Sequence, residues 1–163
     1  MESCEVLIVG AGPAGSTCAR LLTKAGLSVL LLDRDEFPRD KPCAGWITPA
    51  VLETLGIDPQ QYRQGRLLQE IREFRTGAMY GNEMVTDYGT TVSYSIRRSE
   101  FDHFLLLRSA TRVALGEAVT SLEQTADGWL VNGNIRARLL IGADITALSH
   151  VPWARSQERN RLL

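Results

Sequence analysis

The chain has 163 residues, a formal net charge of −1 and a hydrophobic fraction of 44%, values typical of one soluble globular domain with its own core. The balanced charge argues against nucleic acid as a partner, and neither a transmembrane segment nor a signal-peptide pattern is expected. Three cysteines outside any CxxC pair and two histidines in no ligand pattern argue against disulfides and a metal site, so a cytoplasmic location is expected.

The N-terminal residues predict a strand, a glycine-rich turn and a helix. Residues 5–10 are apolar on both faces, as in a central parallel strand. Gly10 permits a tight turn, Gly12 lets the backbone approach a pyrophosphate, and Gly15 lets helix and strand pack closely. The helix that follows has Gly26 as its stop, and its N-terminal amides favour an anion. The candidate cofactor-binding residues of this turn are Gly10, Gly12, Pro13, Ala14 and Gly15.

A second parallel strand is predicted at residues 29–32, and it ends at Asp33. Asp33 follows the turn by about twenty residues, where a carboxylate can accept both ribose hydroxyls of a dinucleotide. A glycine motif alone is a weak signal, but a strand before it, a helix after it and an acid at this distance together indicate dinucleotide binding. The alternative for Asp33 is a solvated strand end.

Residues 34–47 form a long loop rich in proline and charge, and such a loop usually has a function or is mobile. The run from Gly10 to Ile57 resembles the N-terminus of geranylgeranyl reductase-like flavoproteins, within the FAD-dependent group of aromatic-hydroxylase fold. That family has a Phe-Pro-Arg-x-Lys-x-Cys-Gly-Gly segment beside the flavin, and Ala44 stands here where the family usually has glycine. The matching residues are Phe37, Pro38, Arg39, Lys41, Cys43 and Gly45.

This resemblance implies FAD rather than NAD as the resident cofactor. It implies that Asp33 and Arg34 lie at the adenosine end of FAD. Cys43 has two interpretations: a thiol near flavin and substrate, which makes it the candidate catalytic residue, or a small apolar residue that packs the loop. The cofactor-binding residues expected in the loop are Lys41, Cys43, Ala44 and Gly45.

The middle of the chain predicts small elements. A short helix is expected from the N-cap Thr48 to Gly56, and Asp58-Pro59 marks a turn. Residues 67–96 mix apolar and polar positions with glycine breaks, which is typical of short antiparallel strands. In the family that the chain resembles, the first strands of a substrate-binding sheet lie here.

A buried helix is predicted from Ser99 to Ala110, because Ser99 and Asp102 have the spacing of a capping box. The segment also resembles the family's Arg-x-x-Phe-Asp motif, with its arginine at Arg98. The resemblance implies that Arg98 lies near the flavin and its phosphate-bearing chain, where a planar guanidinium binds oxygens in two places. The alternative is a surface arginine that precedes a helix cap.

A parallel strand is expected at residues 113–115. Strands near 118–125, 128–132 and 135–139, joined by turns at Asp127-Gly128 and Asn132-Gly133, predict a three-stranded β-meander. The resemblance implies that the backbone around Val119 meets the adenine. It also implies that an apolar strand at 139–144, which carries Gly142 and Asp144, returns to the cofactor.

The resemblance stops at Ile145, where the family has glycine, and residues 145–163 form a basic, atypical tail. Members of the family are more than twice as long as this chain. These features suggest a truncated gene product with a change of reading frame near Ala143. Sheet edges and apolar helix faces would then be exposed and would favour self-association.

The predicted fold class is therefore α/β: a Rossmann-like FAD-binding βαβ domain with a three-stranded β-meander and part of an inserted antiparallel substrate sheet. The FAD-binding domain is expected at residues 1–64 and 97–144, the start of the substrate sheet at 65–96, and the tail at 145–163.

The leading functional hypothesis is an FAD-binding oxidoreductase, a reductase or a monooxygenase, in which flavin accepts or delivers hydride. An apolar small molecule, isoprenoid or aromatic, is the expected substrate, and NAD(P)H is a candidate external reductant. Peripheral contact with a membrane stays open. Two alternatives are an NAD-dependent dehydrogenase, against which the Phe37–Cys43 segment argues, and a non-catalytic remnant that binds nucleotide.

Overall fold

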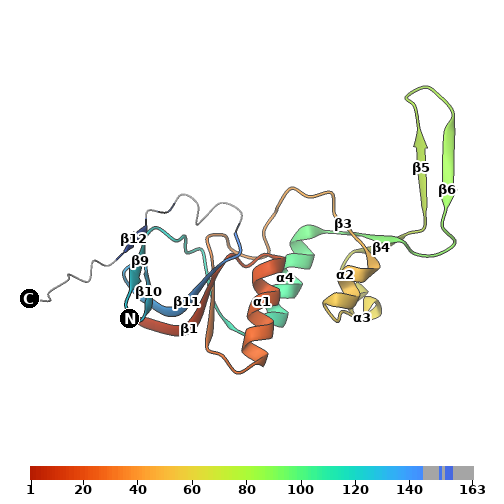
Figure 1. Cartoon of the computed structure of the whole chain (residues 1–163). Coiled ribbons are helices and arrows are strands. Elements are labelled where there is room, and N and C mark those ends of the chain that lie inside the picture. The colour runs from red at the N-terminus through yellow and green to blue at the C-terminus, as the bar shows by residue number, and fades with distance from the viewer. Residues whose placement is uncertain (145–150, 152, 156–163) are drawn as a thin grey trace, which may run out of the picture. The chain divides into compact units, whose positions relative to one another are not determined.

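The computed structural model describes residues 1–144, 151 and 153–155. The chain divides into two compact units (Figure 1): unit 1 contains Met1–Arg39 and Asp102–Leu163, and unit 2 contains Asp40–Phe101. The domain ranges expected from the sequence stay predictions, and most of the predicted tail lies outside the described residues.

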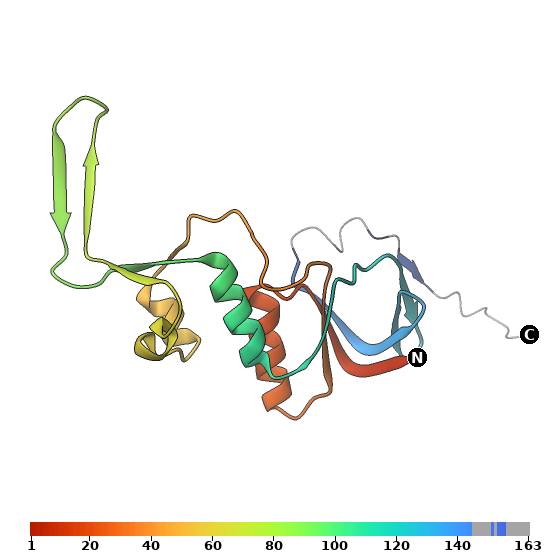
Figure 2. The same ribbon diagram turned by 180° about the vertical axis from the view of Figure 1, so that it is seen from behind.

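Unit 1 is built on a seven-stranded sheet with the strand order β12-β9-β10-β11-β1-β2-β8. The central strand β1 is parallel to β11 on one side and to β2 on the other, and Figure 2 shows β1 and β11 alongside one another. The edge strand β8 is parallel to β2, so the predicted parallel βαβ core is confirmed. The strands are β1 (Glu2–Val9), β2 (Val29–Asp33), β8 (Arg112–Leu115), β9 (Leu122–Thr125), β10 (Gly128–Val131), β11 (Ile135–Gly142) and β12 (Trp153–Arg155).

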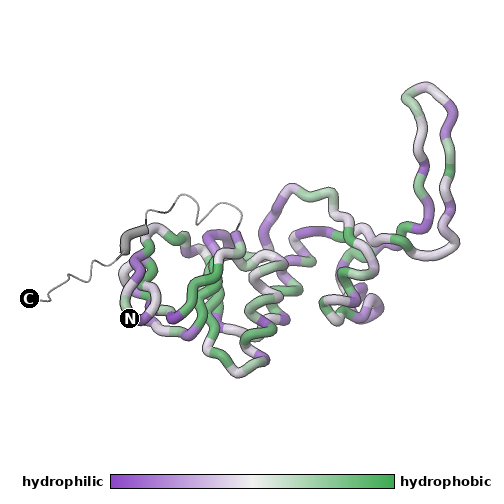
Figure 3. The backbone as a smooth tube through the Cα atoms, in the orientation of Figure 1, coloured by the Kyte–Doolittle hydropathy of each residue, from purple (hydrophilic) through white to green (hydrophobic). Residues whose placement is uncertain are grey.

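Hydrophobic residues cover both faces of the central strands, because successive side chains of a strand point to opposite faces. Val6 and Ile8 of β1 pack with Ala19 of helix α1 (Pro13–Lys24) and Leu106 of helix α4 (Arg98–Ser109). The opposite face packs against β9, β10 and β11. Figure 3 shows the strands of this core as hydrophobic. A core that is apolar on both faces holds the ends of β1 and β2 in place.

The β-meander is present, with one correction to its last strand. Residues 135–139 and 139–144 were expected to form two separate strands, but β11 is one strand from Ile135 to Gly142. Its first residues pair antiparallel with β10, while its whole length pairs parallel with β1. The prediction failed because the two pairings use opposite edges of one strand, and a sequence pattern does not reveal which edge is paired.

Unit 2 contains a three-stranded antiparallel sheet in the order β3-β7-β4, and a separate hairpin of β5 and β6. The antiparallel strands predicted for residues 67–96 are therefore confirmed. The elements are β3 (Trp46–Ile47), α2 (Pro49–Thr54), α3 (Pro59–Arg63), β4 (Leu68–Ile71), β5 (Glu73–Gly77), β6 (Glu83–Asp87) and β7 (Ser93–Ile96).

Two local predictions about helix starts were wrong. Asp58-Pro59 does not form a simple turn: Asp58 is the N-cap of α3, and its Oδ1 accepts a hydrogen bond of 2.9 Å from the Gln60 amide. Pro59 takes the first helical position, for which its fixed φ angle is suited. Helix α4 already begins at Arg98, so Ser99 lies inside its first turn. Within the described residues, no helix is long and apolar enough to cross a membrane.

Candidate dinucleotide-binding site

The glycine turn lies where β1 ends and α1 begins. Gly10 has a φ of +107°, and a Cβ there would lie 2.7 Å from Ala143 C and Asp144 N. A Cβ on Gly15 would collide with the carbonyl oxygen of Gly10. Gly10 and Gly15 are therefore required by close packing of the backbone. The predicted role of Gly15 in helix–strand packing is consistent with this geometry.

Gly12 differs from the other two glycines, because a Cβ there would make an ordinary van der Waals contact and no clash. It is the N-cap of α1 and has a φ of −66°, which any residue adopts. A Cβ there would lie 3.6 Å from the Nη2 atom of Arg39. The first turn of α1 thus leaves room for a group next to its free amides, and a helix N-terminus favours an anion.

Asp33 fastens the turn to the second strand. It is buried, its Oδ2 accepts a hydrogen bond of 2.6 Å from the Ala11 amide, and its Oδ1 accepts one of 2.9 Å from the Asp35 amide. The alternative of a solvated strand end is thereby excluded. Each carboxylate oxygen can accept more than one hydrogen bond, so the predicted contact with ribose hydroxyls stays compatible with this geometry.

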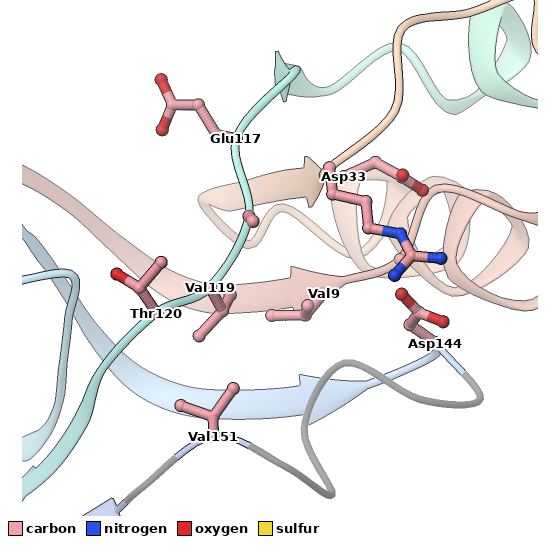
Figure 4. A pocket seen from close by; sticks show the side chains of 10 residues that line it. Val9, Asp33, Glu117, Val119, Thr120, Asp144 and Val151 are labelled. Atoms are coloured by element: carbon pink, nitrogen blue, oxygen red, sulfur yellow. The ribbon is translucent and has the colours of Figure 1, made fainter.

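A cavity of about 440 Å³ opens beside the turn. Figure 4 shows Val9 and Val119 next to one another, with Asp33 and Asp144 at the strand ends. Apolar side chains suit the faces of a base, and polar groups at the edge suit a sugar. The cavity is lined by Val9, Gly10, Asp33, Arg34, Glu117, Ala118, Val119, Thr120, Asp144 and Val151.

The cavity brings together residues predicted from four separate segments: Gly10, Asp33 with Arg34, Val119, and Asp144. Gly142 pairs with Val9 in the sheet register, at the end of β11 that leads into the site. In open parallel sheets, ligands bind outside the carboxyl ends of the strands. The cavity and the Gly12 space both lie at that end, where they suit a nucleoside and its phosphates.

Five predicted residues belong to unit 2: Lys41, Cys43, Ala44, Gly45 and Arg98. Cys43 is exposed, and its Sγ lies 3.4 Å from the Gly45 amide. Gly45 has a φ of +66°, and a Cβ there would lie 2.5 Å from the Ile96 carbonyl oxygen, which explains the need for glycine. The roles of these five residues toward the flavin stay predictions. In the part of the chain that the structure describes, no cluster of side chains could hold a metal ion.

Arg39 is a residue of the site that the sequence pattern did not single out. Its side chain is only 12% exposed, and its Nη2 lies 3.6 Å from Oδ2 of Asp102, which is 1% exposed. The guanidinium also lies 4.7 Å from the centre of the Phe37 ring. The matching Phe-Pro-Arg segment contained this residue, but its partner Asp102 is on a distant helix, and no local pattern links them.

A parallel sheet with a glycine turn and a cavity at its carboxyl ends defines a dinucleotide-binding domain of the Rossmann type. The chain belongs to the FAD binding domain family, which it matches over residues 3–145. This membership and the relatives below confirm the resemblance to geranylgeranyl reductase-like flavoproteins.

Two of the curated relatives that the chain matches are named as reductases. Digeranylgeranylglycerophospholipid reductase 1 of Methanothermobacter thermautotrophicus is 32% identical over 92% of this chain and 41% of its own length. Menaquinone reductase of Mycobacterium tuberculosis is 32% identical over 91% of this chain and 31% of its own length. The chain therefore spans about two fifths or less of these relatives.

Solved structures show the same fold. A geranylgeranyl bacteriochlorophyll reductase-like protein from Thermoplasma acidophilum has a TM-score of 0.74 at 24% identity, over 88% of this chain and 40% of its own. The halogenase PltM, in complex with phloroglucinol and FAD, has a TM-score of 0.67 at 20% identity, over 86% of this chain and 34% of its own.

Proposed function

We propose that this chain binds the ADP half of FAD and forms the N-terminal part of a flavin-dependent oxidoreductase. The observation that carries the proposal is that Gly12, where a Cβ would meet no clash, lies two residues from Gly10 of the cavity lining, because a pyrophosphate and an adenosine need neighbouring spaces. Membership of the FAD binding domain family supports FAD as the dinucleotide.

Different residues of the proposed site bind the phosphates and the nucleoside. The amides at the start of α1 hold the pyrophosphate next to Gly12. Asp33 takes the ribose hydroxyls, and Val119 packs against the adenine. The Asp33–Ala11 hydrogen bond keeps the turn in one conformation before the ligand arrives, so little ordering cost remains on binding.

When bound, FAD supplies the hydride chemistry of the reaction, and the protein supplies binding, orientation and exclusion of water. We propose an apolar substrate of the isoprenoid type, since the names of the relatives specify digeranylgeranylglycerophospholipid and menaquinone. NAD(P)H is proposed as the external reductant. The segment that carries Cys43 is proposed to lie beside the flavin.

A Gly12→Val variant tests the binding site. The φ of −66° at Gly12 suits valine, and a Cβ there would lie 3.6 Å from Arg39 Nη2, an ordinary contact. The fold is therefore expected to persist while the side chain occupies the pyrophosphate space. Loss of FAD and ADP binding is expected in equilibrium dialysis, with circular dichroism unchanged.

The matched control is Ala25→Val, which also introduces a valine, at the exposed C-cap of the same helix, and it is expected to bind FAD like the wild type. Unchanged FAD binding by a folded Gly12→Val variant would contradict the proposed site.

Reduction is a separate measurement from binding. The chain loaded with FAD is mixed with NAD(P)H without oxygen, and the visible absorbance of the oxidised flavin is followed. Loss of this absorbance would show that NAD(P)H reduces the bound flavin, and it supports an enzyme. Bound FAD that NAD(P)H leaves oxidised supports the alternative of a nucleotide-binding chain without catalysis of its own.

A further inference from the structure

A partly buried cation, the Arg39 guanidinium, lies near Gly12. The Arg39 side chain is 12% exposed, and its Nη2 lies 3.6 Å from the position that a Cβ on Gly12 would take. Burial of a guanidinium is costly unless its charge and its hydrogen-bond donors are satisfied. The partners of Arg39 therefore decide what this residue does.

The described partners attract the Arg39 guanidinium, but they lie too far away for good hydrogen bonds with its N–H donors. Asp35 Oδ2 lies 3.6 Å from Nε, and Asp102 Oδ2 lies 3.6 Å from Nη2, distances that give attraction but exceed a good hydrogen bond. The Phe37 ring supports the guanidinium plane at 4.7 Å. The buried Nε has no hydrogen-bond partner among the described residues.

Such an arrangement fits a ligand with several acceptor oxygens. Arginine presents five donors in a planar fork that matches phosphate oxygens in two places. An anion next to Gly12 would meet the α1 amides on one side and Arg39 on the other.

We propose that Arg39 binds the pyrophosphate of the dinucleotide and that Asp102 is the positioning residue that aims Arg39 at it. This inference rests on the proposed function. It adds a pyrophosphate-binding side chain from the loop, Arg39, and a positioning side chain from α4, Asp102. Asp102 is 1% exposed and sits on a helix packed against the sheet, so its carboxylate is a fixed point. Asp35, the other carboxylate near Arg39, is about half exposed.

The test compares ligands with and without phosphates. Arg39→Gln is expected to weaken binding of ADP by about 10- to 100-fold, the range for a lost hydrogen-bonded charge, and binding of adenosine by less than about twofold. Arg39→Lys keeps the charge but loses the fork, so an intermediate loss for ADP is expected. Binding is measured by isothermal titration calorimetry on the full chain.

Arg75→Gln is the matched control, because Arg75 is an exposed arginine of the β5–β6 hairpin with an acidic neighbour, Glu73. It is expected to leave binding of both ligands unchanged. If Arg39→Gln does not fold, Arg39→Lys decides the question by its ratio of ADP to adenosine affinity. An unchanged ratio in the folded variant overturns the proposal.

Asp102→Asn tests the positioning role, because the amide has nearly the same shape without the charge. A loss of about 3- to 10-fold for ADP is expected, with adenosine unaffected, and the loss should disappear in the Arg39→Gln background, since the two residues act as a unit. Tighter ADP binding would show that Asp102 competes with the phosphates and would overturn the proposal. A wild-type chain that binds neither FAD nor ADP would refute the proposed function itself, whereas wild-type binding that survives Arg39→Gln refutes this inference alone.

Discussion

The central strands of unit 1 and the β5–β6 hairpin of unit 2 are opposite cases of strand structure. All five residues of β2 are buried, whereas every residue of β5 and β6 is exposed except the partly buried Phe74. Figure 3 shows the same contrast in the hydropathy of the two regions. Packing on two faces determines the position of β2. The hairpin is instead stabilised by the backbone pairing of β5 with β6 and by two aromatic ring contacts.

The comparison teaches where a precise binding site can be built. Asp33 is the last residue of β2, so its position is determined by a strand that packs on both faces. The ring contacts of the hairpin region join Phe74 to Trp46 at 5.4 Å and to Tyr88 at 6.0 Å. Such partly exposed contacts stabilise a hairpin but do not fix a side chain within the tolerance that a ligand requires.

The largest expected effect is a core truncation that tests this contrast. Leu31→Ala truncates a side chain that is 0% exposed. The free energy of unfolding of this variant should be lower than that of the wild type by about 2–5 kcal/mol. Val85→Ala in the hairpin, where Val85 is 50% exposed, should change it by less than about 0.5 kcal/mol. Urea unfolding followed by circular dichroism measures both variants, and equal losses would contradict the contrast.

A smaller effect is expected at the glycine turn. Gly15→Ala places a Cβ against the Gly10 carbonyl oxygen, and such overpacking costs about 1–3 kcal/mol. The control Gly26→Ala has a φ of +86° but open space around it, so only backbone strain of about 1 kcal/mol is expected. The urea unfolding midpoints of the two variants show which substitution destabilises the protein more. A larger loss of stability for Gly26→Ala than for Gly15→Ala would show that packing does not dominate at the turn.

The smallest effect concerns an exposed ion cluster in unit 2. Hydrogen bonds from Arg63, Arg72 and Thr91 lower the pKa of Glu70 from 4.5 to about 2. Because the pKa of this acid is lower in the folded state, its stabilising contribution is present above pH 4.5 and is lost as the pH falls toward 2. Glu70→Gln should therefore be less stable than the wild type near neutral pH and equal to it at about pH 2.

Thermal unfolding at several pH values measures this difference, and added salt should shrink it, since exposed pairs are screened. A difference between Glu70→Gln and the wild type that stays constant down to about pH 2 would contradict the lowered pKa.

The sequence predicted best what local patterns determine. The glycine turn, the parallel strands and the hairpin at Asn132-Gly133 follow from residue type and spacing, and Asn132 and Gly133 do adopt φ angles of +51° and +68°. The full length of β11 was not predictable, because its two pairings depend on strands far apart in sequence.

The ion pair of Arg39 with Asp102 was not predictable for the same reason. Asp102 has capping-box spacing to Ser99, but tertiary packing buries it and pairs it with the loop instead. Local patterns therefore identified the glycine turn of the site. The position of the charged Arg39 side chain near that turn is seen only in the folded chain.

The placement of β11 also has a consequence for synthesis of the protein on the ribosome. Strand β1 is the first to emerge, and its neighbour β2 follows soon after, but its other neighbour β11 ends at Gly142. At about 5–20 residues per second, the edge of β1 that pairs with β11 in the folded chain stays unpaired for several seconds or longer during translation. Throughout that interval, the nascent chain presents a strand edge that chaperones can recognise and that other chains can join.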